Sequence, residues 1–392
     1  MTDGKKLIED LQALVPILRE RGSAAEEAGR IPEETIEDLK RINAFKAVVP
    51  KAYGGMEVDF PFIPQIFRMM GRGCVSTSWC MGFLIYHNFQ FGHYNRKAQE
   101  EAFGGVGYTM AAGLVVPGGQ ATRVDGGFVL NGRWNYATGI LHCDYLAMPA
   151  PVASEFDPDG PPDFYRFYVP VEQIEVLDTW HVAAMKATGS RDVTLTDVFV
   201  PEHRGIPVKS LRERTSPGLQ INTGPLWQVP VMTFMAFGTV GSMVGAAEAV
   251  FEMVRDILKT KVGAYSGDQQ SGLMSQRIRI ARIKMELDAT IGLLEAKAEF
   301  VWKTVQRGVT MSREQRAEMR MVVSHITKKC HEIVNELAHT AGTRSVYLDS
   351  PIQRFHRDVN ALATHAIFEF DHVGSLFGGT LLGIEPPATA MI

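Results

Sequence analysis

The chain has 392 residues, of which 45% are hydrophobic and 21% are charged, and its formal net charge is −4. A chain of this size can bury a large core, and its length favours two or three domains over one. Acidic and basic residues are interspersed along it, so no basic face is predicted that would neutralise nucleic-acid phosphates. We therefore expect no nucleic-acid partner.

The N-terminal segment, MTDGKKLIEDLQALVPILRE, alternates charges with apolar residues. It lacks the basic start and apolar run of a targeting segment. No later segment reaches the ~18 uncharged apolar residues that a membrane helix needs. We therefore expect a cytoplasmic protein without membrane attachment.

The four cysteines are scattered and contain no CxxC pair; they are Cys74, Cys80, Cys143 and Cys330. This pattern argues against a zinc site and against a disulfide framework. His331-Glu332 begins like a zinc motif, but Asn335 stands where the second histidine would be. We expect no metal site, and the cysteines are interpreted as small core residues.

Hydrophobic periodicity divides the chain into three parts, beginning with an N-terminal helical domain at residues 1–108. Within it, RIPEETIEDLKRI begins as a helix should, with Pro32 in the first turn and acids beside it. Residues 109–215 have an apolar period of two and predict a central β domain. There we expect a hairpin in GGFVLNGRWNYATG with Asn131-Gly132 at its turn, followed by strands at YRFYVPV and VTLTDVFV.

The helical period returns in residues 216–392, where three apolar stripes are predicted. The stripes are Val244, Ala247, Phe251, Val254 and Leu258; Ile280, Ile283, Leu287, Ile291 and Leu294; and Val323, Ile326, Cys330, Ile333 and Leu337. Long amphipathic helices need one another to bury such stripes, so we expect a C-terminal four-helix bundle. The predicted fold class is α+β and multidomain.

Several enzyme signatures are absent from the sequence, among them GxGxxG between a strand and a helix, the P-loop, GxSxG and HExxH. A Rossmann nicotinamide enzyme is therefore not expected. Five segments in chain order instead resemble the acyl-CoA dehydrogenase superfold, which has a helical domain, a β-barrel or sandwich, and a four-helix bundle. They are VVPKAYGG, GLVVPGGQA, NGRWNYATG, TWHVAAMKATGSRDVTLTDVFVP and SPIQRFHRDV.

Within this superfold, WxYATG followed by DTWHVxxMKATGS resembles the reduced-flavin-dependent monooxygenases, typified by p-hydroxyphenylacetate hydroxylase and related phenol hydroxylases. The resemblance implies that reduced flavin (FMNH2 or FADH2) and O2 form a C4a-hydroperoxide that hydroxylates a small phenol- or indole-like substrate. It also implies a separate NAD(P)H:flavin reductase and a homotetramer. The protein would have to exclude water, bind flavin N5 and hold the substrate. Oxygenation of nitrogen or sulfur by the same fold stays open.

The resemblance also assigns flavin contacts to residues of this chain. The hydroxyl of Thr138 would hold the N5 proton. Lys259 and Lys261 stand where the superfold has an arginine that reaches the phosphate of a neighbouring subunit, and the AGTRS segment lies where relatives meet a partner's nucleotide. The implied cofactor-binding residues are Val115, Trp134, Tyr136, Thr138, Gly139, Thr188, Ser190, Lys259, Gly342 and Thr343.

Acyl-CoA dehydrogenation needs a carboxylate to remove a proton from the thioester substrate. By resemblance that glutamate would fall at Ala366, and the alternative seat, in PVMTFMAFG, contains no acid. Glu369 lies four residues beyond His365 and would share its helical face, which leaves it as a candidate for a displaced base. A dehydrogenase or oxidase that uses this base, and a flavin-free binding protein, are the alternative functions.

Phenol hydroxylation profits from a base, and neutral histidine has a suitable pKa. The resemblance matches His87, in LIYHNFQFG on a helix before the β domain, to a histidine that contacts the substrate. It matches His365 to a histidine on the C-terminal helix near the reactive edge of the flavin. Which of the two is the base stays open, while His93 and His181 are weaker candidates.

Overall fold

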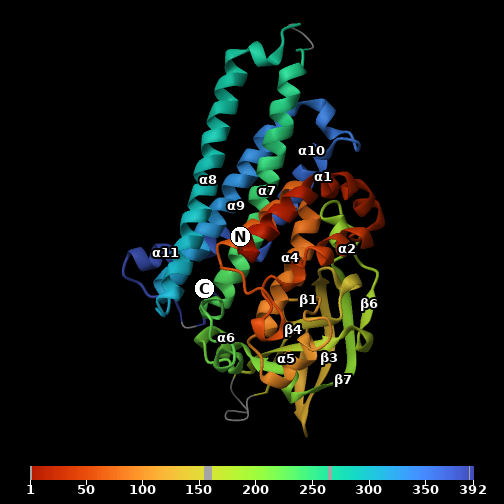
Figure 1. Ribbon diagram of the computed structural model, residues 1–392, viewed down its shortest axis with the longest axis vertical. Helices are drawn as coiled ribbons and strands as arrows, with labels where there is room; N and C mark the ends of the chain where they lie inside the picture. Colours follow the sequence, from red (N-terminus) through yellow and green to blue (C-terminus); the bar gives the residue numbers. More distant parts are fainter. Residues whose placement is uncertain (1, 154–160, 264–266, 388) are drawn as a thin grey trace.

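The computed structural model of the protein describes residues 2–153, 161–263, 267–387 and 389–392. An N-terminal group of helices, a central sheet and a long helical bundle follow one another along the chain (Figure 1). The arrangement confirms the predicted α+β fold class. The hairpin of the two longest bundle helices projects beyond the rest of the molecule, at the end opposite the sheet.

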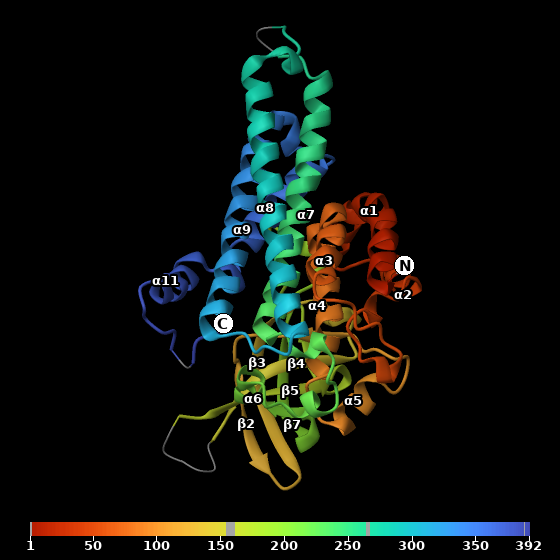
Figure 2. The ribbon, with the colours of Figure 1, turned by 60° about the vertical axis from the view of Figure 1, so that its left-hand side comes forward.

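The N-terminal part contains five α-helices: α1 (Asp3–Ala28), α2 (Glu33–Arg41), α3 (Phe62–Gly73), α4 (Val75–Phe91) and α5 (Arg96–Phe103). Pro32 precedes α2 directly, as its N-cap, and acids fill the first turn. Every residue of α4 is buried, because this helix contacts α3, α7, strand β1 and the loop around residues 186–188. The position of α4 between the three parts (Figure 2) makes it the element on which a shared site is built.

Eight strands form one sheet: β1 (Ala111–Gly113), β2 (Gly119–Val124), β3 (Gly127–Ala137), β4 (Tyr145–Val152), β5 (Asp163–Pro170), β6 (Glu175–Leu177), β7 (Arg191–Pro201) and β8 (Gly205–Pro207). Their order is β6-β7-β3-β2-β4-β5-β8, and β1 pairs with β4. Strands at YRFYVPV and VTLTDVFV are confirmed as β5 and β7. A buried cluster that includes Phe128, Trp134 and Phe167 fills the core of this part.

The predicted hairpin turn at Asn131-Gly132 is wrong. The strand β3 runs through both residues, and the turn lies earlier, at Asp125-Gly126, where Val124 pairs with Gly127. At Asn131 the pairing of β3 with β7 shifts its register between Leu130 and Gly132. An Asn-Gly pair favours a bulge as well as a turn, since glycine tolerates the irregular backbone of either.

Helix α6 (Val208–Glu213) contacts β5 and β8 of the sheet. The C-terminal part contains α7 (Val231–Thr260), α8 (Met274–Gln306), α9 (Arg313–Ala341), α10 (Pro351–Leu362) and α11 (Phe370–Leu381). The predicted stripes of α7 and α9 are buried throughout, while Ile280 and Ile291 of the α8 stripe are partly exposed. Ridges of apolar side chains thus join α7, α8, α9 and α10 into a bundle. By length and composition α7 resembles a membrane span, yet 94% of its most apolar window is buried in the fold.

Candidate active site

Two loops meet beside α4 and bring three hydroxyl groups into one hydrogen-bonded chain of hydroxyls. The first loop follows β3 at Thr138, and the second contains the 3₁₀ turn Lys186–Thr188. Ser190 Oγ lies 2.9 Å from Thr138 Oγ1 and 2.6 Å from Thr188 Oγ1. The Gly139 amide also donates to the Thr188 carbonyl oxygen over 2.9 Å. The structure therefore brings together three of the residues that the sequence assigned to cofactor binding.

The backbone has positive φ beside both loops, with 69° at Tyr136 near the end of β3 and 55° at Met185. Residues other than glycine rarely take this backbone conformation, and when they do, the surrounding structure must hold it in place. A Cβ atom on Gly139 would lie 2.6 Å from Cys80 Sγ on α4, so only glycine permits this close approach. The loops are thus fixed against a buried helix, and Tyr136 keeps 65% of its surface exposed beside them.

A buried carboxylate anchors the second loop from the far side. Asp358 on α10 accepts hydrogen bonds from the Met185 amide over 2.6 Å and from Ser76 Oγ over 2.9 Å. Burial raises the pKa of Asp358 to about 6, although both hydrogen bonds lower it. Its neighbour Arg357 donates to the Ala183 carbonyl oxygen. The Arg-Asp pair therefore positions the loop, a role that the sequence analysis did not assign.

An aromatic ladder runs along one face of α4 and includes both candidate histidines. We use this name for Trp79, Phe83 and His87 on α4, which are spaced four residues apart, together with the ring of His365. Ring centroids are 4.8 Å apart between Trp79 and Phe83 and 6.0 Å apart between Phe83 and His87. His365 lies across the edge of Trp79, at 5.0 Å. The two histidines that the sequence proposed thus belong to one packed surface.

His87 is a neutral hydrogen-bond acceptor at Nε2. Its Nδ1 lies 2.7 Å from the Ala111 carbonyl oxygen. Because a carbonyl oxygen only accepts, Nδ1 carries the proton and Nε2 holds the lone pair. Burial, reinforced by the positive charge of Arg166, lowers the pKa of His87 to about 3. The imidazole therefore stays neutral near neutral pH.

His365 has the opposite arrangement of its ring nitrogens. The residue lies beyond the end of α10, where it caps the short turn Ala366–Phe368, and its Nδ1 accepts from the Ile367 amide over 3.2 Å. In the neutral ring, Nε2 therefore carries the proton and is a potential donor. Burial, followed by the charge of Arg320, lowers the pKa of His365 to about 4. Its predicted place on the C-terminal helix is wrong, because the chain leaves the helix three residues earlier.

The predicted pairing of Glu369 with His365 on one helical face is also wrong. Glu369 is exposed and caps α11, with both carboxylate oxygens accepting from the His372 amide. Residues 365–369 form a turn between two helices, so the spacing of four does not place the side chains together. Ala366 is exposed. The described residues therefore offer no carboxylate at either seat expected for a dehydrogenase.

Comparisons with known proteins agree with this architecture. The acyl-CoA dehydrogenase N-terminal domain matches residues 14–99, and the acyl-CoA dehydrogenase C-terminal domain matches residues 237–370. A pigment production hydroxylase of a Rhodococcus species is 32% identical over 95% of each chain. The p-hydroxyphenylacetate 3-hydroxylase oxygenase component of Acinetobacter baumannii is 28% identical over 98% of this chain and 91% of the relative. The crystal structure of the HsaA monooxygenase from M. tuberculosis superimposes with a TM-score of 0.93 at 26% identity, covering 99% of this chain and 100% of that one.

The chain belongs to the flavin-dependent monooxygenases of the acyl-CoA dehydrogenase family. Their cofactor, reduced flavin, needs hydrogen-bonding groups along its ring edge and a dry surface around it. The three hydroxyls at Thr138, Ser190 and Thr188 would supply the polar groups, and the aromatic ladder would supply the apolar surface. The residues present therefore fit the cofactor of the family.

The remaining predicted contacts of this monooxygenase differ in how well they fit. Trp134 does not fit a side-chain contact to flavin, because it is fully buried in the β-domain core and donates its indole N–H to the Pro149 carbonyl oxygen. Val115 is 41% exposed in the loop before β2. Lys259 pairs with Asp256 on the surface. The corrected assignment removes Trp134 and leaves Val115 and Lys259 untested.

Lys261, rather than Lys259, meets the segment after α9. Its ammonium group donates to the Ala341 carbonyl oxygen over 2.9 Å and caps the end of that helix. A Cβ atom on Gly342 would lie 2.8 Å from this nitrogen, and Gly342 has φ of 79°. The end of α7 and the segment with Gly342 and Thr343 thus form one unit at the bundle end.

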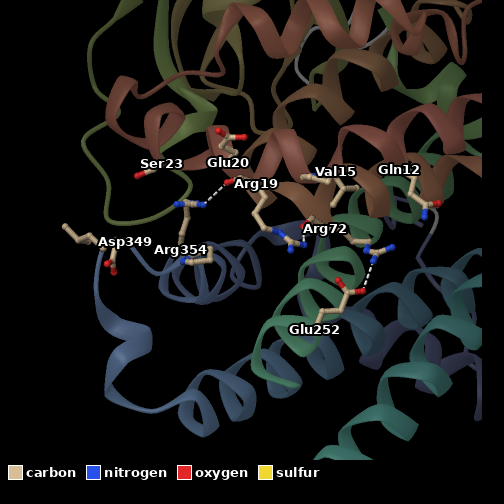
Figure 3. A pocket seen from close by; sticks show the side chains of 12 residues that line it. Gln12, Val15, Arg19, Glu20, Ser23, Arg72, Glu252, Asp349 and Arg354 are labelled. Atoms are coloured by element: carbon tan, nitrogen blue, oxygen red, sulfur yellow. Dashed lines mark hydrogen bonds and ion pairs between the residues drawn. The ribbon is translucent and has the colours of Figure 1, made fainter. Parts of the chain in front are cut away.

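A cavity of about 660 Å³ is lined by residues of α1, α3, α7 and α10 and of the segment before α10 (Figure 3). Arg72 pairs with Glu252 on its wall over 2.6 Å. Arg354 lies directly over Gly22 and donates to the Arg19 carbonyl oxygen. None of the residues that line the cavity belongs to the hydroxyl chain or the aromatic ladder. It is therefore a separate feature from the candidate active site.

His93 and His181 lie outside the site. His181 is exposed, and its ring bonds to the Asp178 carbonyl oxygen. His93 is buried beyond the end of α4, 3.0 Å from Ser216 Oγ. Burial, followed by the charge of Arg214, lowers the pKa of His93 to about 3. This residue therefore contributes to stability rather than to the site.

His93 gives the fold a dependence on pH. Below its unfolded pKa of about 6.5 the unfolded chain binds a proton that the folded state refuses, so stability falls as the pH decreases toward about 3. Between about pH 7 and about pH 5 this loss amounts to about 2 kcal/mol. In urea unfolding measured at both pH values, His93→Gln should therefore lose about 2 kcal/mol less than the wild type. Equal losses in the two proteins would contradict the burial of a neutral ring.

Proposed function

We propose that the chain is the oxygenase component of a two-component system and hydroxylates the ring of a phenol. The observation that carries this proposal is the neutral His87, whose Nε2 lone pair is fixed by the bond from Nδ1 to Ala111. A hydrogen-bond acceptor at this place suits a substrate with an acidic O–H group. The similarity to a p-hydroxyphenylacetate 3-hydroxylase, which is named for a phenol, supports the same conclusion.

Each element of the site then has a distinct task. Reduced flavin, when bound, supplies the oxygen-transfer chemistry with O2. Thr138, Ser190 and Thr188 would hold its polar edge, and the Thr138 hydroxyl would keep the proton at N5. His87 Nε2 accepts the phenol O–H and increases the electron density of the ring. His365 Nε2 donates a hydrogen bond from the other end of the aromatic ladder, near the flavin.

The low pKa of His87 is compatible with this task. Because its pKa is about 3, the His87 imidazole is unprotonated near neutral pH in the empty site. Its Nε2 can therefore accept a proton from the substrate. A phenol that develops negative charge against Nε2 raises the pKa of the imidazole, because the charged form then gains a nearby anion. The base therefore becomes effective only when the substrate is present.

The proposal requires a reductase as a separate protein. We expect the purified chain with NADH, flavin and a phenol to form no hydroxylated product until an NAD(P)H:flavin reductase is added. Product should then form with consumption of NADH and O2, measured by chromatography and by an oxygen electrode. Steady oxidation of NADH by the chain alone would contradict the proposal, as would bleaching of bound flavin by acyl thioesters.

A further inference from the structure

We propose that Arg166 binds an anionic substrate oxygen beside His87, so that the enzyme takes its phenol as the phenolate. The inference rests on the proposed function and extends it by naming the ionisation state of the substrate. Arg166 lies on β5, in register with Pro149 of β4 and Ile206 of β8. It does not stand out in the sequence, because a lone arginine within YRFYVPV resembles any exposed strand residue.

The guanidinium group of Arg166 is held inward without a carboxylate partner. Its Nη1 donates to the Leu114 carbonyl oxygen over 2.7 Å. Its Nε is buried and has no hydrogen-bond partner among the described residues. No ion pair of Arg166 occurs in the described ranges either, whereas other arginines of this domain pair with acids, as Arg133 does with Asp192. The group is half-buried, and its buried Nε has no partner among the described residues, so an anion that joins it would stabilise it.

Arg166 and His87 converge on one point at Gly113. A Cβ atom on Gly113 would lie 2.0 Å from His87 Nε2 and 3.1 Å from Arg166 Nη2. Any side chain at this position would displace the histidine ring, so glycine keeps the two nitrogens next to each other. An acceptor and a cationic donor are thereby placed side by side. This pair is complementary to a phenol that passes its O–H proton to Nε2 and leaves its oxygen opposite the guanidinium.

The other titratable groups around this point do not cancel the positive charge. Tyr86 packs against His87, with ring centroids 5.1 Å apart, and burial raises its pKa to about 12. Burial also raises the pKa of Tyr94, which donates its hydroxyl to the Arg166 carbonyl oxygen. The side chains of Tyr86 and Tyr94 are therefore neutral near neutral pH. A carboxylate on the substrate would suit Arg166 but would face the Nε2 lone pair with no proton to share, which favours the phenolate.

The test uses p-nitrophenol, a phenol whose ionisation is visible by absorbance, bound to the full chain with reduced flavin under anaerobic conditions. The bound probe should ionise at a pH lower than the free probe by about 1 unit or more, because a nearby cation stabilises the anion. Arg166→Met should abolish this shift and weaken binding about tenfold to 100-fold. Arg166→Lys keeps the charge but loses the planar fork, and should retain part of the shift.

The exposed Arg133→Met is the matched control and should behave as the wild type. Circular dichroism and thermal unfolding would show that the variants are folded, and the lysine variant keeps the test decisive should the methionine variant unfold. An unchanged shift in both Arg166 variants would overturn the proposal. So would p-nitrobenzoate, a carboxylate without a phenol, competing in an Arg166-dependent way that the phenol does not share. An Arg166-dependent phenolate shift without hydroxylation of any phenol would support Arg166 and contradict the proposed function alone.

Discussion

Replacing His87 with alanine is expected to lower coupled hydroxylation by about 10²-fold to 10⁴-fold, the range for loss of a general base. The substitution removes the Nε2 lone pair, which is held in place by the hydrogen bond from His87 Nδ1 to the Ala111 carbonyl oxygen. It leaves the oxygen of the phenol against Arg166 without a proton acceptor. Product formed per NADH consumed, measured with the reductase present, gives the size of the effect.

His93→Gln is the matched control for His87, since both residues are buried histidines with a pKa of about 3. It should leave coupled turnover near the wild-type rate at neutral pH. His365 carries a proton at Nε2 and is three ring contacts from His87 along the ladder, so His365→Ala should change the rate less than His87→Ala. A large loss for His365→Ala with little change for His87→Ala would assign the base to the C-terminal histidine.

Replacing Thr138 with valine is expected to raise the ratio of hydrogen peroxide to hydroxylated product about tenfold or more. The hydroxyl of Thr138 is the end of the chain that runs through Ser190 to Thr188. Loss of one hydrogen bond worth about 1.4 kcal/mol changes a rate tenfold. Valine has nearly the same shape as threonine, so the packing of the loop should be retained. Peroxide and product are quantified in the same reaction mixtures.

Two further variants locate the effect. Thr122→Val changes an exposed threonine on β2 and should leave the ratio unchanged. Ser190→Ala removes the partner that orients the Thr138 hydroxyl without removing the hydroxyl itself, and should give an intermediate ratio. If Thr138→Val and Thr122→Val release equal amounts of peroxide, Thr138 has no part in holding the flavin proton.

Local patterns determined much of this protein from the sequence alone. The stripes of α7 and α9 specify which faces are buried, because a helix repeats its faces every 3.6 residues. The loops of Thr138 and Ser190 were assigned from the resemblance of WxYATG and MKATGS to motifs of the flavin-dependent monooxygenases. Reasoning from local patterns failed at two places. At Asn131-Gly132 the local pattern fits a bulge as well as a turn. The spacing of Glu369 from His365 fits a continuous helix as well as a break between two helices.

Contacts between distant segments were decided by the tertiary structure only. The roles of His87 and His365 depend on which ring nitrogen is bonded, and that depends on Ala111, 24 residues away from His87, and on a turn that ends a helix. Asp358 is joined to Met185 across 173 residues, and Arg166 reaches His87 from a different domain. Sequence spacing carries no information about such pairs, because hydrogen bonds and charges act over a few ångströms in space, and only the packed core of α4, the sheet and the bundle brings these groups that close.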